Sequence, residues 1–565
     1  MEQILAIRSS DLVDRFGVAT HMAYTDGGYR ELSTILNALR YLGIDNVRDD
    51  APNPAWDAYG QAHIAQAAAA GIDFTFYAQG WIDPATVVAR IHAIEQATPG
   101  SVTAIEGPNE VNNWPVSYKG LTGTPAAQAY MRDLFNAVQA DPLLRDLPVT
   151  GFTDYPNHSS TSDASAIHSY TKEGDQPFAT MVYDMAAQER VDPGKPFYIT
   201  ETGYHTKINP SYGWEGVSEA VQAKLVLNTY MDGVLLGAKQ VYIYQLLDAY
   251  AGNSQEEYFG LFRLDKSPKP AATAIHNLTT ILADIGTTAE TFATQTLDFT
   301  VTNAPTTGHT MLSQKSNGTW QIITWAEPDI WNEATNQAIN VAPTSQKISF
   351  AQTFQKIEIF DPLLGTSPIR TFTNVSSVNV DVTDHPIIVQ LSGGAGAAAV
   401  GGAATSGDLH AVYRFFDAGN TREHFYTTSA AERDAIINNL PSYQYEGVHW
   451  ATPDKSVVGA VDVYRFFNTV QRTHLFTRDI GERDSIIENL PGMVYEGVAF
   501  QAYSGNTNVG GQLSLKRFFD PTRGDHHFAP PAEASAIQNG SAGPNWVDEG
   551  PGLMVHVIDS SIFIG

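Results

Sequence analysis

Eight short apolar stretches alternate with helix-like segments between residues 15 and 285, and this alternation limits the possible folds more than any other feature. Leu32, Ile35 and Leu39 illustrate the helical spacing, which Gly43 ends. Eight strand–helix units predict a closed (β/α)8 barrel over residues 1–288. An open doubly wound sheet rarely takes eight such units, and no Gly-x-Gly-x-x-Gly follows the first stretch. The stretches begin at Arg15, Asn46, Asp73, Val102, Pro148, Ala166, Pro196 and Gln240.

The helical period disappears after residue 288. Apolar and polar residues alternate, as in Leu297, Phe299 and Val301, and Asn317-Gly318 marks a hairpin. Residues 289–392 therefore predict an antiparallel β-sandwich. Residues 393–407 contain no large side chain and predict a flexible linker.

The tail, residues 408–565, is an internal repeat. The hexapeptides that begin at Val412, Val463 and Leu515 share Arg-Phe-Phe and recur about every 51 residues. Mostly strand-like copies predict pseudo-threefold closure as a β-trefoil-like domain, with a three-bladed stack as the alternative. We expect this domain to bind carbohydrate, with the histidine after each hexapeptide either contacting ligand or bonding within its own turn. Those histidines are His424, His474 and His527.

Composition excludes several functions. The net charge of −28 disfavours nucleic acid and anionic membranes, and it favours a neutral substrate. The absence of cysteine excludes disulfides and thiolate metal sites. The histidines show no ligand spacing, so we expect neither metal nor cofactor. The sequence has no apolar run of about 20 residues, so we do not expect it to insert into a membrane. We expect a secreted monomer whose signal peptide is not part of this sequence.

Two predicted barrel strands end in carboxylates, at Glu110 and Glu201. The strands of a barrel open their carboxyl ends on one face, so these two glutamates are expected to meet. Glycosidic bond cleavage requires such a pair, one protonated and one ionised. Arg48, at the end of the second strand, is expected to keep Glu201 ionised. Glu106, two pleats below Glu110, is expected to be a buried acid inside the barrel.

The stretches Gly107-Pro-Asn-Glu-Val-Asn112 and Thr200-Glu-Thr-Gly203 resemble the clan A retaining (β/α)8 glycoside hydrolases. The resemblance is nearest to the branch with β-xylosidases, α-L-iduronidase and bacterial exopolysaccharide endoglycosidases, and it covers residues 15–285. The sandwich and the tail are similar to an accessory domain of that branch and to an aromatic repeat of secreted bacterial hydrolases.

The resemblance implies a role for each matching residue. Glu110 would be the acid/base, Glu201 the nucleophile and Asn109 the contact to the substrate 2-hydroxyl. Arg48 matches the strand-two arginine, and His168 and Tyr170 match the His-x-Tyr of strand six. Two positions depart from the family pattern, because Val111 replaces a common proline and Tyr244 or Gln245 replaces the strand-eight tryptophan.

Aromatic residues in or beside the predicted strand-to-helix loops, among them Tyr24, Trp81 and Trp114, suggest a cleft lined for sugars, to which Tyr244 of the eighth strand would contribute. The chain is therefore predicted to be a retaining glycoside hydrolase of a polysaccharide or oligosaccharide. Two alternatives remain at this stage. One is a non-catalytic glycan-binding or adhesin protein on a degenerate barrel, and the other is a transglycosylase.

Overall fold

The computed structural model describes residues 2–24, 26–53, 58–284, 289–393, 409–453, 455, 460–503, 512–540 and 545–556. The predicted linker, apart from residue 393, lies outside these residues. The chain divides into two compact units. One unit contains the barrel and most of the strands that follow it, and the other contains the tail together with residues 2–5 and 295–298.

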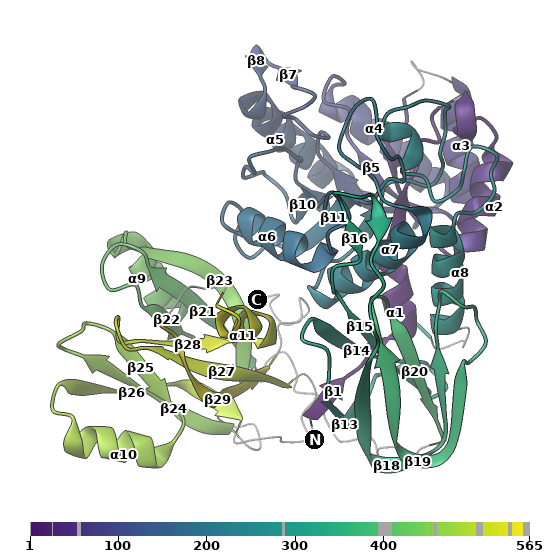
Figure 1. Cartoon of the computed structure of the whole chain (residues 1–565). Helices are drawn as coiled ribbons and strands as arrows, with labels where there is room; N and C mark the ends of the chain where they lie inside the picture. Colours follow the sequence, from purple (N-terminus) through teal and green to yellow (C-terminus); the bar gives the residue numbers. More distant parts are fainter. Residues whose placement is uncertain are drawn as a thin grey trace. The chain divides into compact units, whose positions relative to one another are not determined.

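The first unit is built on an eight-stranded parallel barrel (Figure 1). Its strands pair in the order β10-β11-β12-β3-β4-β5-β6-β9. A parallel bridge between Thr150 and Ala164 joins the two ends of this order and closes the barrel. The strands are β3 (Phe16–Ala19), β4 (Asn46–Asp50), β5 (Asp73–Tyr77), β6 (Val102–Glu106), β9 (Val149–Thr150), β10 (Ser165–His168), β11 (Phe197–Thr202) and β12 (Val241–Ile243).

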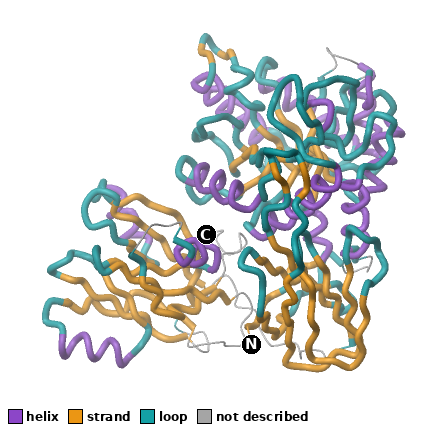
Figure 2. The backbone as a smooth tube through the Cα atoms, in the orientation of Figure 1, coloured by secondary structure: helices purple, strands orange, loops and turns teal. Residues whose placement is uncertain are grey.

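Helices surround these strands (Figure 2). Their ends follow local chemistry, since Ser218 caps the N-terminus of α7 and Gly43 ends α2 with φ +66°. No helix separates β9 from β10 in the described residues 151–164. The helices are α1 (Ser9–Asp14), α2 (Leu32–Leu42), α3 (Ala58–Ala69), α4 (Pro84–Ala97), α5 (Thr124–Ala140), α6 (Pro177–Glu189), α7 (Glu219–Leu235) and α8 (Pro270–Leu282), with short 3-10 turns η1 (Gly27–Tyr29) and η2 (Glu256–Tyr258).

Several strands are shorter than the sequence predicts. The fourth strand ends at Glu106 rather than Glu110, because Gly107-Pro108 follows and proline has no N–H to donate to the ladder. The carboxylate of Glu110 therefore comes from a loop, in which β7 (Ser117–Tyr118) and β8 (Leu121–Thr122) form a small hairpin. No helix in the described part of the chain is both long enough and apolar enough to cross a bilayer.

The strands after the barrel form a continuous, mostly antiparallel sheet that we call the β-domain. It includes β2, near the N-terminus, where Ile7 pairs with Ser313, so the predicted boundary at residue 288 misses this strand. Trp325 and Ile323 of this sheet belong to the same hydrophobic core as the barrel. The strands are β2 (Ile7–Arg8), β13 (Thr296–Thr302), β14 (Gly308–Gln314), β15 (Trp320–Ala326), β18 (Thr344–Phe360), β19 (Arg370–Val382) and β20 (Ile387–Ser392), with β16 (Trp331–Asn332) and β17 (Gln337–Ala338) as a separate hairpin and β1 (Glu2–Leu5) preceding β2.

The tail consists of three equivalent units, each with three strands and one helix. The helix is missing from the sequence prediction, although Ser429 and Asp479 cap α9 and α10 three residues before a glutamate, as in a capping box. The last strands of the three units meet, since β29 pairs with both β23 and β26. The units are β21 (Leu409–Asp417), β22 (His424–Thr427), α9 (Ala430–Asn439) and β23 (Tyr443–Pro453); β24 (Ala460–Asn468), β25 (His474–Thr477), α10 (Ile480–Asn489) and β26 (Met493–Tyr503); and β27 (Gln512–Asp520), β28 (Asp525–Ala529), α11 (Pro531–Gln538) and β29 (Val547–His556).

Candidate active site

The structure brings the two predicted glutamates together at the carboxyl ends of the barrel strands. Glu201 lies in β11, and Glu110 lies four residues beyond the end of β6. One carboxylate oxygen of each lies within 4.8 Å of the other, and both lie as close to a ring nitrogen of His168. Two acids that are distant in the sequence therefore share one small volume.

The backbone of Glu110 is strained. Its φ of +40° lies in the left-handed region, which non-glycine residues rarely adopt. The hydroxyl oxygen of Thr153 accepts its N–H at 2.9 Å, and the Asn113 amide donates to its Oε2 at 2.9 Å. Such strain persists where the surroundings hold it, and it clusters at functional sites.

Both oxygens of Glu201 receive a hydrogen bond. Arg48 Nη1 donates to Oε2 at 2.7 Å, and the Tyr170 hydroxyl donates to Oε1 at 2.7 Å. Arg48 is buried and its guanidinium lies 4.6 Å from the centre of the Tyr77 ring. These contacts fix the orientation of the Glu201 carboxylate, which is only 9% exposed.

Glu106 lies inside the barrel, as the sequence predicts, and is fully buried. Arg48 Nε donates to its Oε2 at 2.6 Å, while Arg48 Nη2 donates to the Asn109 amide oxygen at 2.6 Å. Burial opposes the ionisation of Glu106, but the charges of Arg48 and His168 outweigh burial and lower the pKa of this carboxyl. One guanidinium thus connects Glu106, Glu201 and Asn109.

The proton of the site is held by His168. Burial disfavours the imidazolium, yet Glu201, Glu106 and Glu110 raise the pKa of His168 to about 9. Its Nδ1 lies 3.0 Å from Glu110 Oε1. Burial alone would raise the pKa of Glu110, but the bond and charge of His168, with the Asn113 amide, lower it to about 2. The lowered pKa of Glu110 runs against the sequence prediction that this acid is protonated, and His168 is the adjacent group whose raised pKa favours holding the proton.

Glu110, His168 and Glu201 also have the donor atoms that a metal ion would need. The Arg48 guanidinium already contacts Glu201 Oε2 at 2.7 Å. A dication bound to the same carboxylate would repel this buried cation, which disfavours metal binding at this cluster.

Aromatic rings form a wall beside the carboxylates. Tyr24 stacks on His21 at 4.7 Å, and Tyr244 contacts both His21 and Phe259 edge-on at 5.9 and 5.3 Å. Trp214 lies 6.0 Å from Tyr170 on the same wall. The peptide bond between Tyr244 and Gln245 is cis.

The two remaining predicted tryptophans are exposed, Trp81 at 64% and Trp114 at 67%. Three contributors were not anticipated from the sequence, namely His21, Asn113 and Phe259. Asn113 follows Glu110 by three residues, a spacing that permits its amide to reach back to the carboxylate. His21 and Phe259 carry no local signal, because only the barrel closure places them beside Tyr244.

Two of the tail histidines bond between repeats rather than within their own turn. His424 and His474 bond to acids of a neighbouring repeat, Asp525 at 2.8 Å and Glu423 at 3.2 Å. Cross-strand pairing with the second phenylalanine of each hexapeptide identifies His526, not His527, as the third equivalent. These side chains connect repeats.

Comparison with known proteins gives matches of two kinds. The family DUF5648, a domain of unknown function, matches residues 398–556. A search of curated proteins gives no match.

The first unit is similar to solved structures at low identity. A family 39 glycoside hydrolase from the gut symbiont Bacteroides cellulosilyticus WH2 is 14% identical, with 68% of this chain and 82% of that chain covered and a TM-score of 0.47. A monomeric β-xylosidase from Caulobacter crescentus CB15 is 14% identical, with 69% and 98% covered and a TM-score of 0.45. A β-glucuronidase from an uncultured Clostridium species is 15% identical, with 47% and 50% covered and a TM-score of 0.36.

Proposed function

We propose that this chain is a retaining glycoside hydrolase that acts on a polysaccharide or oligosaccharide. The observation that carries the proposal is the short separation of the two carboxylates, because one oxygen of Glu110 lies within 4.8 Å of one oxygen of Glu201. Retaining enzymes hold their carboxyl groups ~5–5.5 Å apart, whereas inverting enzymes need ~6.5–9.5 Å to admit a water. A separation within 4.8 Å between one oxygen of Glu110 and one of Glu201 favours the retaining arrangement over the inverting one.

Each residue has a role in the proposed double displacement. Glu201 attacks the anomeric carbon and forms a covalent ester while the glycosidic bond breaks. The leaving oxygen takes a proton from the Glu110–His168 pair, whose members lie 3.0 Å apart. Glu110 then removes a proton from water, which attacks the anomeric carbon and releases Glu201. Arg48 and Tyr170 hold the nucleophile for both steps.

The test begins with reducing-end release from a panel of neutral and acidic polysaccharides. Glu201→Gln should lower turnover by at least ~10⁴-fold, since covalent catalysis is lost. Glu110→Ala should still release phenolate from aryl glycosides in the first step, seen as an initial burst, because this leaving group needs no proton. Its steady-state turnover should fall, because Glu110 is also the base of the second step, and it should not cleave natural glycans. Unchanged turnover by Glu201→Gln on a cleaved substrate would refute the assignment.

Two further readouts separate the related possibilities. Proton NMR of the first product should show the anomeric configuration of the substrate, and inversion would exclude the mechanism. Added acceptor sugars should not replace water as the main acceptor, and predominant transfer would identify a transglycosylase.

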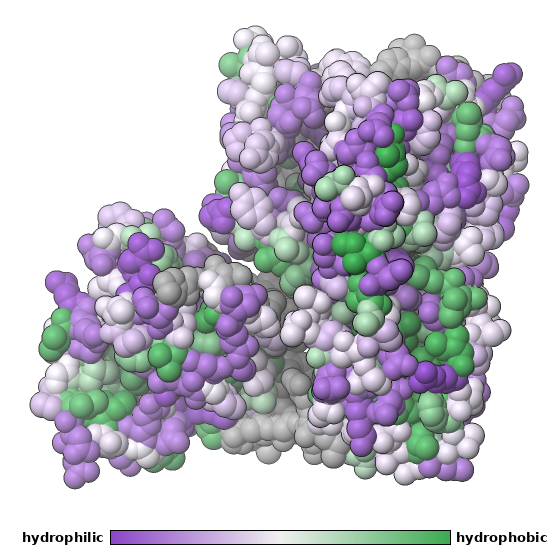
Figure 3. Space-filling model, viewed as in Figure 1, coloured by the Kyte–Doolittle hydropathy of each residue, from purple (hydrophilic) through white to green (hydrophobic). Residues whose placement is uncertain are grey.

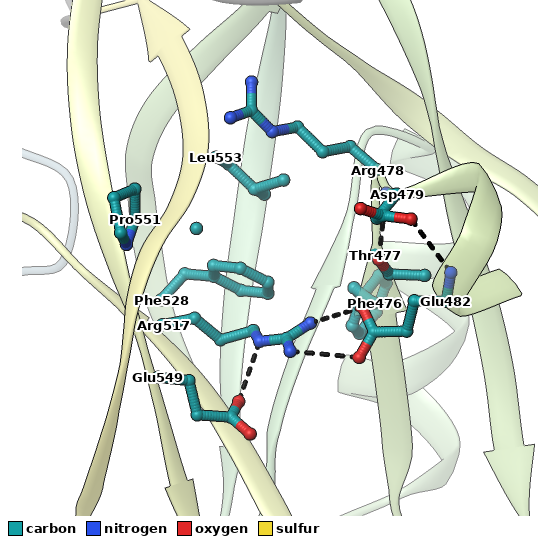
Figure 4. Close-up of a pocket in the computed structure, with 11 residues that line it drawn as sticks. Phe476, Thr477, Arg478, Asp479, Glu482, Arg517, Phe528, Glu549, Pro551 and Leu553 are labelled. Carbon is teal, nitrogen blue, oxygen red and sulfur yellow. Dashed lines mark hydrogen bonds and ion pairs between the residues drawn. The ribbon is translucent and has the colours of Figure 1, made fainter.

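We also propose that the tail binds glycan, at the seam between its second and third repeats. A cavity of about 210 Å³ lies there, lined by Phe528 and Leu553 on one side and by Thr477 and Arg478 on the other (Figure 4). Arg517 lies at its base, where dashed lines mark its bonds to Glu482 and Glu549. The lining is mostly polar and charged, with the apolar faces of Phe528 and Leu553 on one side, and a sugar ring presents both hydroxyl groups and an apolar face.

The other two seams contain larger side chains at the position of Leu553. Cross-strand pairing places Trp450 and Phe500 there, and both rings are buried. We therefore propose one glycan site in the tail, at this seam, rather than one at each of the three seams. In the Glu201→Gln protein, Leu553→Trp should abolish retention on the polysaccharide that the chain binds. Equal retention would argue against this seam.

Hydrophobic side chains also gather on the tail surface over β24 and β26 (Figure 3). Val494, Tyr495 and Val498 of β26 are 49%, 42% and 46% exposed. A triple variant of these three residues is the matched control for the seam, since it changes an exposed surface and leaves the cavity lining intact.

A further inference from the structure

Three side chains with metal-ligand chemistry meet where α7 of the barrel lies against the β-domain. Asp232 lies on α7, His309 lies on β14, and Glu327 directly follows β15. One carboxylate oxygen from each acid and one ring nitrogen of His309 lie within 4.8 Å of one another. Because the barrel and the β-domain share one hydrophobic core, packing of regular elements holds this cluster in place.

Two oxygens of this cluster lack a donor. Asp232 is fully buried, and its Oδ1 accepts a hydrogen bond from Trp325 Nε1 at 2.9 Å. Its Oδ2 is buried without any hydrogen-bond partner, and so is Oε1 of Glu327. Within the described chain neither acid has a lysine or arginine partner. A buried carboxylate without a donor or counter-charge is costly, so these oxygens need either a bound cation or a proton shared between the two acids.

A second buried acid at the same junction shows how this chain neutralises a carboxylate with its own residues. Lys224, two turns earlier on α7, donates to Asp384 Oδ2 at 2.7 Å. His385 Nδ1 lies 2.8 Å from the other oxygen of Asp384. Their charges and bonds overcome the burial that disfavours ionisation and lower the pKa of Asp384. Asp232 lies on the same helix as Lys224, yet the described residues provide no such cation for Asp232 or Glu327.

His309 is suited to coordinate a metal. Its ring lies 4.4 Å from Phe178 and 5.4 Å from Trp325, so it is held between two aromatic side chains. A neutral imidazole coordinates a metal through a ring nitrogen, and one ring nitrogen of His309 faces the two acids. His309 and Glu327 are half-buried, which leaves a route for an ion to enter.

We propose that Asp232, His309 and Glu327 form a structural site for a divalent transition-metal cation of the Zn²⁺ type, which links α7 to the β-domain. Zn²⁺ binds imidazole nitrogen and carboxylate oxygen at ~2.0–2.2 Å in a tetrahedral shell, with water as a possible fourth ligand. Tetrahedral ligands at that length are about 3.4 Å apart, so donor atoms that lie within 4.8 Å of one another would draw together by at most about 1.4 Å when the ion binds. Hard cations such as Ca²⁺ and Mg²⁺ prefer six or more oxygens and do not fit this donor set.

The experiment uses the full chain, purified without a polyhistidine tag, stripped with a chelator and titrated with ZnCl2 by isothermal calorimetry. We expect one equivalent to bind, and Tm to rise with free Zn²⁺ as it does for any ligand of the folded state. Asp232→Asn, His309→Gln and Glu327→Gln should each abolish this binding. Circular dichroism shows whether each variant folds, and the half-buried Glu327 and His309 provide folded variants if Asp232→Asn does not.

Two controls separate this site from its neighbours. Glu110→Gln/Glu201→Gln removes the acids of the other three-donor cluster, and it should leave Zn²⁺ stoichiometry unchanged. Asp384→Asn changes the neutralised acid of the same junction and should also leave it unchanged. Loss of binding in the Glu110/Glu201 variant would place the ion in the barrel site and overturn the proposal.

The rival explanation is a proton shared between Asp232 and Glu327. It predicts no Zn²⁺ binding up to millimolar concentration, and an Asp232→Asn protein that is as stable as wild type with or without chelator. Preference for Ca²⁺ or Mg²⁺ over Zn²⁺ would equally refute the site as proposed. None of these measurements requires a glycan, so this inference can fail while the glycosidase proposal stands.

Discussion

The barrel and the tail each hold arginines between two glutamates, but they use this arrangement differently. In the barrel, Arg48 contacts Glu106 at 2.6 Å and Glu201 at 2.7 Å. In the tail, Arg465 lies 2.8 Å from Glu496 of its own repeat and 3.1 Å from Glu432 of the preceding one. Arg414 and Arg517 repeat the tail pattern at the other two seams.

The difference lies in what surrounds the second carboxylate. Around Glu201 the structure adds Tyr170, His168 and a second acid, all at one barrel mouth. Around Glu432 it adds the next repeat, and the same contact recurs in a ring of three. A buried arginine between two glutamates is therefore a structural element by itself. It becomes part of a candidate active site only where further reactive groups lie beside it, as His168 and Glu110 lie beside Glu201.

Replacing the two arginines should give the largest contrast. Arg48→Met leaves Glu106 buried without its cation and releases Glu201, so turnover should fall by ~10³-fold or more. Arg465→Met should leave turnover unchanged and lower the free energy of unfolding of the tail by about 1–3 kcal/mol, since this pair is partly exposed. Initial rates and urea unfolding measure the two effects. Arg48→Lys, which keeps the charge without the fork, tests the idea if Arg48→Met does not fold.

The pH profile should depend on His168 and not on the histidines of the tail. The folded-state pKa of His168 is raised from 6.5 to about 9, so its proton is kept at neutral pH and lost as pH rises through about 9. The value of kcat/KM should fall over that range. In His168→Gln, Glu110 loses the charge that lowers its pKa, and the alkaline limb should move below pH 9. An identical profile for wild type and His168→Gln would contradict this; His424→Gln is the control.

One tyrosine hydroxyl in the barrel and one in the tail extend the comparison between the two regions. Tyr170→Phe removes the donor to Glu201 and should lower kcat by about 10- to 100-fold. Tyr426→Phe removes the acceptor of the Phe528 N–H and should destabilise the tail by about 1–3 kcal/mol, with no change in kcat. If Tyr426→Phe slowed turnover, the tail would contribute to the chemistry after all.

Exposed residues should give the smallest effects. Trp114→Ala should change stability by less than about 0.5 kcal/mol, since the ring is 67% exposed. If the ring stacks on substrate, KM for a long oligosaccharide should rise about 2- to 10-fold. Val470→Ala, at a tail residue that is 82% exposed, should change neither quantity. Equal KM values would leave Trp114 without a binding role.

Much of the barrel can be predicted because its signals are local. Apolar runs, helix caps and glycine stops lie within a few residues of the elements they determine, as Gly43 does for α2. The sequence predicts the end of the fourth strand at Glu110, four residues beyond its observed end at Glu106. A proline ends the hydrogen-bonded pairing of a strand without changing the apolar pattern before it. The sequence does not predict the tail helices, because their apolar residues form no clear helical face. The only local signals for α9 and α10 are the capping residues Ser429 and Asp479.

The metal-type cluster was beyond sequence reasoning. Asp232, His309 and Glu327 belong to three elements, with no ligand spacing between them. They meet only because the β-domain packs on α7. Likewise, no local sequence signal indicates that the barrel and the β-domain share one hydrophobic core.

By itself, the sequence determined the eight strand–helix units and the delivery of two carboxylates to one end of a barrel. Periodicity and chain direction suffice for both. Only the tertiary structure decided where the proton lies, between His168 and Glu110, and which acids Arg48 neutralises. Protonation depends on burial and on distances between charges through space, and neither quantity can be read along the chain.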